Sequence, residues 1–233
     1  MPGGRWADVT QAKSPPRLDI SDFRALAGRV AGTSLIEVSR NNHVYRGGTR
    51  DDHVYVVERG QVKTQMVAAS GKRCLLSVYV MGDLFGEIAL LGLERLESAI
   101  ALTRTVLLRV PAARAAAVLA AEGSGDVLAR HLSIRLRHQQ QVVADMVTLP
   151  SELRLAVRLL DLAERFGQRG PGGTRVDIAF TQEDLSEMVG TTRTRIGQFL
   201  KRFRELGMVD FTPRSHLTVH EERLSSWIST ATH

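Results

Sequence analysis

The stretch Thr181–Phe203, TQEDLSEMVGTTRTRIGQFLKRF, has the pattern of two short helices joined by a glycine turn. Thr181 is a favourable N-cap residue, and the acidic residues that follow it suit the positive end of a helix dipole. Gly190 can adopt the left-handed conformation that ends a helix, and Thr191 or Thr192 can cap the next one. The segment therefore predicts a helix-turn-helix.

The second helix of this segment has two distinct faces when its residues are placed about 100° apart. Its apolar face consists of Ile196, Phe199, Leu200 and Phe203, and the opposite face carries Thr194, Gly197, Gln198 and Lys201 between Arg193, Arg195 and Arg202. A solvated amphipathic helix usually mixes both charge signs, yet the first acid here is Glu205. A solvated helix and a helix that enters a groove of DNA both fit this pattern, and the helix upstream favours DNA.

In a helix-turn-helix the second helix lies in the major groove and its N-terminal residues contact base edges. Arg193 could bind guanine with two hydrogen bonds, Gln198 could pair with adenine, and the Thr194 methyl group could contact thymine. The predicted DNA-binding residues are Thr181, Gln182, Thr192, Arg193, Thr194, Arg195, Gln198, Lys201 and Arg202.

Charge and cysteine content restrict the class of protein. The 233 residues carry 31 basic and 25 acidic side chains, a formal net charge of +6. From residue 150 onward we count 12 Lys and Arg against 11 Asp and Glu, so the positive charge there is concentrated on the second helix of the motif. Cys74 is the only cysteine, which excludes an internal disulfide and a four-thiolate iron–sulfur cluster. Without a signal peptide or a long apolar run, we expect a cytoplasmic protein that does not associate with membranes.

The order of patterns along the chain predicts an α+β protein. Short β-rich runs with glycine turns follow a helical pattern at residues 18–40 and suggest a jelly roll, whose last strand ends at Pro111. Residues 167–173, GQRGPGG, are interpreted as a linker loop, and residues 208–219 as the hairpin wing of a winged helix. The predicted parts are a mobile arm (1–17), a β jelly-roll domain (18–125), a dimerisation helix (126–148) and a winged helix-turn-helix domain (149–233).

The predicted dimerisation helix carries a narrow apolar stripe. Its members recur at spacings of 4, 3, 4 and 3 and are Leu132, Leu136, Gln139, Val143 and Met146. This spacing is typical of a coiled-coil seam, with Gln139 as a polar residue that could set the register. Packing of the helix against its own domain is the alternative. A homodimer is favoured because helix-turn-helix proteins usually bind paired half-sites.

With its β domain, long helix and winged helix, the chain resembles the CRP/FNR family of bacterial transcription regulators. The resemblance rests on the segments 53–63 (HVYVVERGQVK), 81–91 (MGDLFGEIALL) and 181–203. It implies an effector-type β domain, binding to double-stranded DNA and contact with RNA polymerase. In the family, FGE opens a phosphate-binding cassette that normally continues to Arg-Ser-Ala.

The cassette, residues 86–99, departs from the family pattern at the position of the arginine that pairs with the cyclic phosphate. The resemblance assigns the effector pocket to Gly86, Glu87, Ile88, Arg95, Glu97, Ser98, Ala99 and Val143. Glu97 occupies the arginine position, and like charges at ion-pair distance cost several kcal/mol at an effective dielectric of about 20. Val143 and Ala144 replace the hydroxyl residues that contact adenine in cyclic-AMP receptors. Arg95 would share the face of Glu97 on a strand, so that a register shift could recruit it.

We therefore expect that cyclic AMP is not the switch, and that the pocket is empty, vestigial or specific for another metabolite. The family includes haem sensors, but His43, His53, His131 and His138 have no assignable second ligand, so no cofactor is expected. No catalytic constellation stands out, so we do not expect an enzyme. Two function classes remain: a homodimeric transcription regulator that binds a near-palindromic site, and a ligand-sensing receptor, through Arg95 or otherwise, in which DNA binding is secondary.

Overall fold

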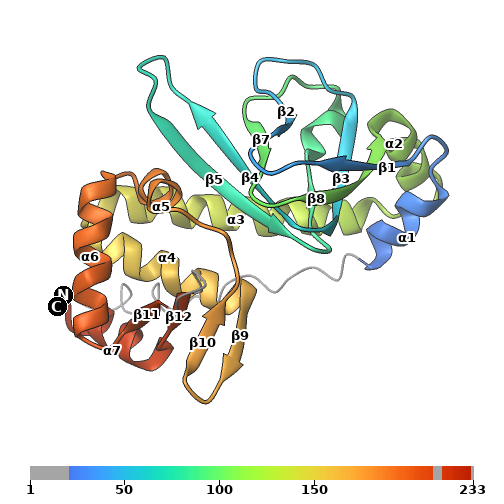
Figure 1. Ribbon diagram of the computed structural model, residues 1–233. Helices are drawn as coiled ribbons and strands as arrows, with labels where there is room; N and C mark the ends of the chain where they lie inside the picture. Colours follow the sequence, from blue (N-terminus) through green and yellow to red (C-terminus); the bar gives the residue numbers. More distant parts are fainter. Residues whose placement is uncertain (1–20, 212–216, 232–233) are drawn as a thin grey trace, which may run out of the picture. The chain divides into compact units, whose positions relative to one another are not determined.

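The computed structural model describes residues 21–211 and 217–231, which form two compact units (Figure 1). The N-terminal unit is Leu18–Leu132, and the C-terminal unit contains Ser133–His233. The division falls inside the long helix α3 (Gly125–Thr148), whereas the sequence suggested boundaries at either end of that helix. The predicted arm, residues 1–17, lies outside the described residues.

Two antiparallel four-stranded sheets form the N-terminal unit, in the orders β1-β8-β3-β6 and β2-β7-β4-β5. The strands are β1 (Ser34–Val38), β2 (His43–Tyr45), β3 (His53–Arg59), β4 (Gln61–Val67), β5 (Arg73–Val80), β6 (Leu84–Phe85), β7 (Ser98–Ala101) and β8 (Thr105–Pro111). A 3-10 helix η1 (Glu87–Leu91) and the helices α1 (Ser21–Arg29) and α2 (Ala112–Ala121) complete the unit. This arrangement confirms the predicted β domain and the predicted end of the last strand at Pro111.

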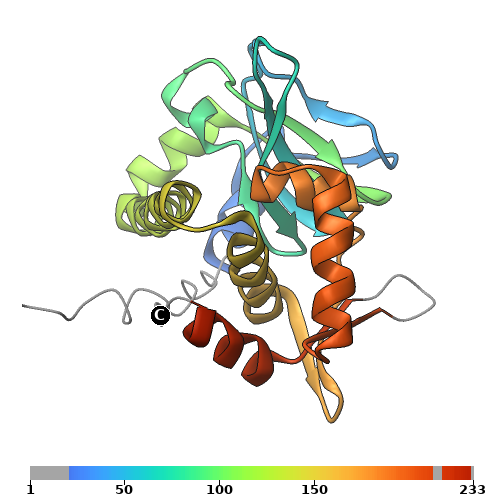
Figure 2. The same ribbon diagram turned by 90° about the vertical axis from the view of Figure 1, so that its left-hand side faces the viewer.

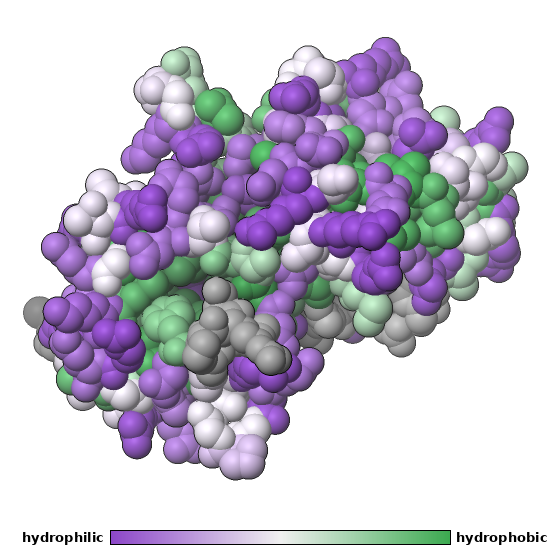
Figure 3. Space-filling view, in the orientation of Figure 1, coloured by the Kyte–Doolittle hydropathy of each residue, from purple (hydrophilic) through white to green (hydrophobic). Residues whose placement is uncertain are grey.

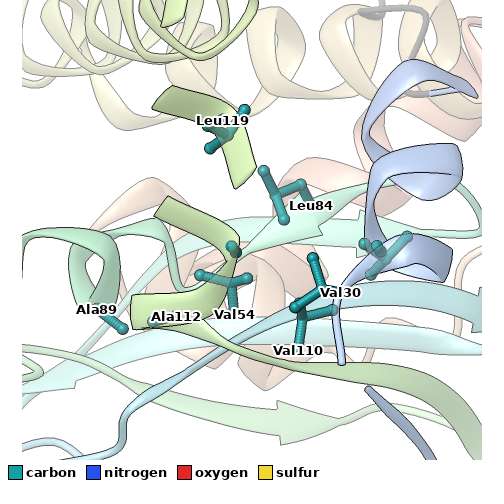
Figure 4. Close-up of a cluster of buried hydrophobic side chains, with 10 residues drawn as sticks. Val30, Val54, Leu84, Ala89, Val110, Ala112 and Leu119 are labelled. Atoms are coloured by element: carbon teal, nitrogen blue, oxygen red, sulfur yellow. The ribbon is translucent and has the colours of Figure 1, made fainter. Parts of the chain in front are cut away.

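Buried apolar side chains hold the helices of this unit against the sheet β1-β8-β3-β6. Val54, Leu84 and Val110 from the strands pack with Val30, at the end of α1, and with Leu119 of α2 (Figure 4). A second cluster contains aromatic rings, including Tyr55 stacked on Phe85 with ring centroids 5.3 Å apart. Strand alternation explains both clusters, because successive side chains point to opposite faces.

The helical pattern predicted for residues 18–40 is wrong beyond Arg29, where α1 ends. Residues 34–38 form β1, and their side chains alternate between half-buried and exposed. Ile36 and Val38 are β-branched and fit this half-buried strand, which pairs with β8. Pairing with a distant strand therefore outweighed the local helical pattern.

The C-terminal unit combines helices with a third antiparallel sheet, in the order β11-β12-β10-β9. Besides part of α3 it contains α4 (Ser151–Phe166), β9 (Gly167–Gly170), β10 (Gly173–Val176), α5 (Gln182–Val189), α6 (Arg193–Glu205), β11 (Val209–Phe211), β12 (Leu217–Val219) and α7 (Glu221–Ala231). Figure 2 shows α5 and α6, in orange, as crossing helices joined by a short turn. The pairing of β11 with β12 confirms the predicted wing, whose tip lies outside the described residues.

Residues 167–173 are not the predicted linker loop. They form β9, a turn and the start of β10, and β10 pairs on its other side with β12. A glycine-rich stretch has low intrinsic strand propensity, so the hydrogen bonds of this sheet must hold these residues in the strand conformation. Among the described helices, none has the length and apolar character needed to cross a membrane.

Candidate functional site

The ends of α5 and α6 have the caps that the sequence predicts. Thr181 accepts a hydrogen bond from the Asp184 backbone N–H at 3.1 Å, and the Asp184 carboxylate accepts one from the Thr181 N–H at 2.8 Å. Gly190 has a φ of 70°, the left-handed conformation that a glycine tolerates best. Thr192 caps α6 by accepting a hydrogen bond from the Arg195 N–H at 3.3 Å. These contacts confirm the predicted helix-turn-helix.

One face of α6 is fixed by burial. Ile196, Leu200 and Phe203 are buried, while Phe199 is half-buried. The Phe203 ring also meets Trp227 of α7 edge-on, with centroids 5.3 Å apart. Aromatic edge contacts of this kind add to the apolar packing that holds the helix. The opposite face of α6 is thereby held outward in a fixed orientation.

The outward face carries the predicted base-reading residues. Arg193, Thr194 and Gln198 are exposed, and no hydrogen bond or ion pair engages their side chains within the described residues. The surface over α6, at the left of Figure 3, is mostly hydrophilic. These three side chains are free to contact base edges from the first two turns of the helix.

The cations near them already contact other side chains of the same unit, and one of these contacts could not be seen in the sequence. Arg202 is bound by both carboxylate oxygens of Glu152, each 3.1 Å from its Nη1, and Glu152 lies in the first turn of α4. Lys201 is 3.9 Å from Glu205, and the Arg195 guanidinium lies over the Phe199 ring at 5.5 Å. Glu152 is 50 residues from Arg202, so no local pattern could have predicted the pair.

Gln182, also predicted to bind DNA, is the first residue of α5, and its side chain lies against α6. A Cβ atom added at Gly197 would be 3.5 Å from its Oε1. Gln182 therefore occupies the crossing of the two helices and is itself exposed.

The apolar stripe on α3 is only partly as predicted. Leu132, Leu136 and Val143 are exposed, with Leu136 and Val143 about equally so at 60% and 62%. Gln139 is half-buried. Met146 is also half-buried, with its sulfur 3.2 Å from the position of a Cβ at Gly190, and is therefore turned toward its own unit. Val147, which is 81% exposed, replaces it at this end of the stripe.

Arg95 occupies the interior of the N-terminal unit beside the start of the cassette. Its side chain is fully buried and donates from Nη1 to the Gly86 carbonyl at 2.6 Å and from Nη2 to the His53 carbonyl. The Asp51 carboxylate is 3.5 Å from Nη2, the Tyr45 ring lies 4.2 Å from the guanidinium carbon, and Nε has no hydrogen-bond partner among the residues that the structure describes. One donor of the buried guanidinium is therefore unused.

Arg95 and Glu97 do not share a strand face, contrary to the prediction. Strand β7 begins at Ser98, so both residues lie in the preceding loop, with Arg95 buried and Glu97 half-buried. The Tyr45 hydroxyl donates to Glu97 at 3.0 Å. Burial, followed by the charge of Glu97, raises the pKa of Tyr45 far above its usual range, so the phenol stays a donor.

Two further polar groups of the cassette, Glu87 and Ser98, also have protein partners. Glu87 is buried and its Oε1 lies 2.8 Å from Nε2 of His131 on α3. The Ser98 hydroxyl accepts a hydrogen bond from the Gly47 N–H at 2.9 Å. Ile88 is half-buried and Ala99 is buried, while Val143 belongs to the other unit. Within the described part of the chain, no group of three or more His, Cys, Asp or Glu side chains could hold a metal ion.

Comparison with known proteins assigns both units. Residues 35–122 match the family model of the cyclic nucleotide-binding domain, and residues 153–225 match that of the Crp-like helix-turn-helix domain. The CRP-like cAMP-activated global transcriptional regulator of Mycobacterium tuberculosis is 30% identical over 204 residues, which cover 86% of this chain and 91% of the relative. The global nitrogen regulator of Synechocystis is 25% identical over 202 residues, 85% of this chain and 89% of that protein.

Solved structures agree with this assignment at the level of the fold. A CooA mutant from Carboxydothermus hydrogenoformans superposes with a TM-score of 0.73 at 20% identity, covering 86% of this chain and 90% of the other. FixK2 from Bradyrhizobium japonicum gives a TM-score of 0.70 at 19% identity, covering 83% and 96%. The chain therefore belongs to the CRP/FNR family of transcription regulators, and α5 and α6 form its DNA-binding helix-turn-helix.

Proposed function

We propose that this regulator binds DNA sequence-specifically as a homodimer on a near-palindromic site, and that cyclic AMP is not its switch. The observation that carries the first part is the outward face of α6, where Arg193, Thr194 and Gln198 are exposed beside a buried apolar face. Arginine can bind guanine through two hydrogen bonds, and glutamine can do the same for adenine. These residues therefore supply sequence discrimination.

The exposed stripe on α3 supports the homodimer. Leu132, Leu136 and Val143 follow the spacing of a coiled-coil seam, Val147 lies one turn beyond Val143, and all four are exposed in the single chain. Exposed contiguous apolar surface commonly marks an interface. A two-fold pair of such chains would present two copies of α6 to half-sites one helical turn apart, about 34–36 Å.

The contacts of the cassette support independence from cyclic AMP. Glu97 occupies the family's arginine position and accepts a hydrogen bond from Tyr45, while Nη1 and Nη2 of Arg95 already donate to backbone carbonyls. Glu87 and Ser98 likewise have protein partners. Breaking these bonds subtracts from whatever the nucleotide gains, because the protein groups must find new partners.

A second candidate is a receptor that responds to a cyclic nucleotide or another small anion through Arg95. Two observations favour it. The Arg95 guanidinium is fully buried beside Gly86, where the Asp51 carboxylate lies 3.5 Å from Nη2 and the Nε–H has no hydrogen-bond partner among the described residues, so one donor remains for an anion. In addition, the relative from Mycobacterium tuberculosis is described as cAMP-activated.

Contact with RNA polymerase belongs to this proposal by family membership, while a cofactor and an enzymatic activity do not. The experiment that tests the proposal is selection of bound sequences from random DNA with the full chain, with and without a metabolite extract. We expect a near-palindromic motif with half-sites about 10 bp apart. Recovery of no enriched motif under either condition would refute sequence-specific binding, whereas a motif that requires the extract would establish the receptor.

A further inference from the structure

A single arginine joins the ends of two helices in the C-terminal unit. Arg154 lies in the first turn of α4 and is half-buried. Its Nη1 donates to the Leu149 carbonyl at 2.7 Å and to the Met146 carbonyl at 3.3 Å, both at the end of α3. Its Nε donates to the Val189 carbonyl, at the end of α5, at 2.9 Å.

These acceptors are groups that a helix leaves unsatisfied. The last four carbonyls of a helix have no partner within it and carry the negative end of the helix dipole. A guanidinium has five N–H donors in a fixed plane and can serve carbonyls from two helices at once. Arg154 therefore fixes the end of α5 relative to the end of α3.

A buried ion pair holds the other side of this junction. Asp145 is buried on α3, and its carboxylate accepts hydrogen bonds from Arg158 of α4 and, at 2.8 Å, from Gln141. Removing one member of a buried pair is strongly destabilising because the other charge remains uncompensated. This pair holds the C-terminal end of α3 against α4. Arg154, which also lies on α4, connects both helices to the end of α5.

The bond to Val189 reaches the turn that sets the recognition helix. Gly190 follows with its left-handed conformation, Thr192 caps α6, and Arg193 is the first residue of that helix. A displacement of the C-terminal end of α5 would therefore move Arg193 with it. A displacement of about 1 Å is enough to spoil hydrogen bonds to base edges, whose distances span only about 0.5 Å.

We propose that Arg154 is a positioning residue for DNA recognition: it locks the α5–α6 turn to the end of α3 and does not itself contact DNA. This inference rests on the proposed sequence-specific DNA binding. The competing role is a direct contact of Arg154 with a DNA phosphate. Burial and the neighbouring Arg195 guanidinium lower the pKa of Arg154, which is consistent with two clustered cations that an anion could neutralise.

The test compares Arg154→Ala, Arg154→Lys and wild type in the full chain, on the DNA sequence that wild type selects and on random DNA, over a range of salt. Arg165→Ala is the matched control, because Arg165 lies on the same helix and, within the described part of the chain, contacts Asp161 at 3.5 Å and the ring of the adjacent Phe166. Lys201→Ala is the reference for a phosphate contact. Urea unfolding of each variant reports whether it is folded.

Both Arg154 variants should lose about 10-fold or more on the selected site, with unchanged affinity for random DNA and an unchanged salt slope. Arg154→Lys should not restore the affinity for the selected site, since one ammonium group cannot replace a planar guanidinium that donates to carbonyls of two helices. Lys201→Ala should weaken both DNAs and reduce the slope by about 1.

Equal losses on both DNAs, a slope reduced by about 1 and rescue by lysine would instead establish a phosphate contact and overturn the proposal. Wild-type affinity in Arg154→Ala would also overturn it, as would variants that are unfolded in the absence of urea, since Arg154 would then serve stability alone. A wild-type protein without sequence preference would refute the proposed function itself, which is a separate outcome.

Discussion

Arg193 and Arg202 lie on the same helix, yet their surroundings give them different roles. Arg193 begins α6 with no protein partner among the described residues, whereas Arg202 is bound by Glu152. A free guanidinium can form two hydrogen bonds to guanine, but one that is already paired must first give up a carboxylate. At the scale of single residues, the proposed specificity would therefore depend on which cations the fold leaves unpaired.

Arg193→Ala should cost about 1–3 kcal/mol on the preferred site and relax the preference at one base pair. The loss follows from removal of a bidentate base contact, while phosphate contacts elsewhere remain. Competition binding against sites substituted at each position measures both effects. An equal loss on preferred and random DNA would show that Arg193 contacts only the backbone.

Gly86→Ala should destabilise the N-terminal unit by more than the similar change Gly82→Ala. Both glycines have a φ of 80–90°, which costs an alanine about 1–2 kcal/mol. Only at Gly86 would the new Cβ clash, at 2.9 Å from Nη1 of the buried Arg95, whereas Gly82 has open space. Urea-induced unfolding of the two variants measures the difference. Equal destabilisation would mean that Arg95 moves away without cost.

At the scale of elements, α3 is the helix whose apolar side chains exceed what its own chain covers. Asp145 is buried on α3 by its ion pair, and Met146 is half-buried beside Gly190. Leu136 and Val143 stay exposed, although Leu and Val are among the residues most often buried. One side of α3 therefore packs within its own chain, and the other side leaves apolar side chains exposed.

The double variant Leu136→Glu, Val143→Glu should be monomeric and should bind DNA poorly. Four carboxylates at a two-fold seam would repel one another and would lose water on association, which costs far more than the apolar contact gains. Sedimentation and DNA binding check this, with Leu35→Glu as the control, since Leu35 is equally exposed at 66% but lies on β1. A wild-type chain that sediments as a monomer and binds a single half-site tightly would contradict the prediction.

The elements that the sequence predicts correctly are those with local signals. The caps at Thr181 and Thr192 and the turn at Gly190 lie within a few residues of the helices they delimit. Strand β1 was missed because its order comes from pairing with β8, which is far away in the sequence. The hairpin β9–β10 was missed because its glycine-rich sequence has low strand propensity, while β10 gains order from pairing with the distant β12. The surroundings of Arg95 were missed for the same reason, since its partners Asp51 and His53 are more than 40 residues away.

At the scale of the whole molecule, an effector would have to bind in the N-terminal unit and change the behaviour of the C-terminal one. A ligand shifts such an equilibrium only by the difference between its affinities for the two states. Weak and uniform binding therefore switches nothing, however high the concentration of the ligand.

Cyclic AMP should bind at about millimolar affinity or more weakly, and DNA affinity should not respond to it. Losing a charge-assisted pair with phosphate and gaining Glu97 should each cost a few kcal/mol, and each 1.4 kcal/mol is a tenfold change. Calorimetry with cyclic AMP and cyclic GMP, beside a DNA titration, provides the measurement. Micromolar binding that raises DNA affinity in wild type and disappears in Arg95→Gln would support the receptor instead.

The pairing of β10 with β12 has a further consequence for how such a protein can change its target. Residues 177–208, which contain α5 and α6, leave the sheet after β10 and return to it at β11, and both strands are neighbours of β12. The whole recognition module is therefore an insertion whose two ends are anchored on the same small sheet. Exchange of this insertion for that of a relative should therefore change the DNA sequence that is bound while the sheet that carries it is preserved.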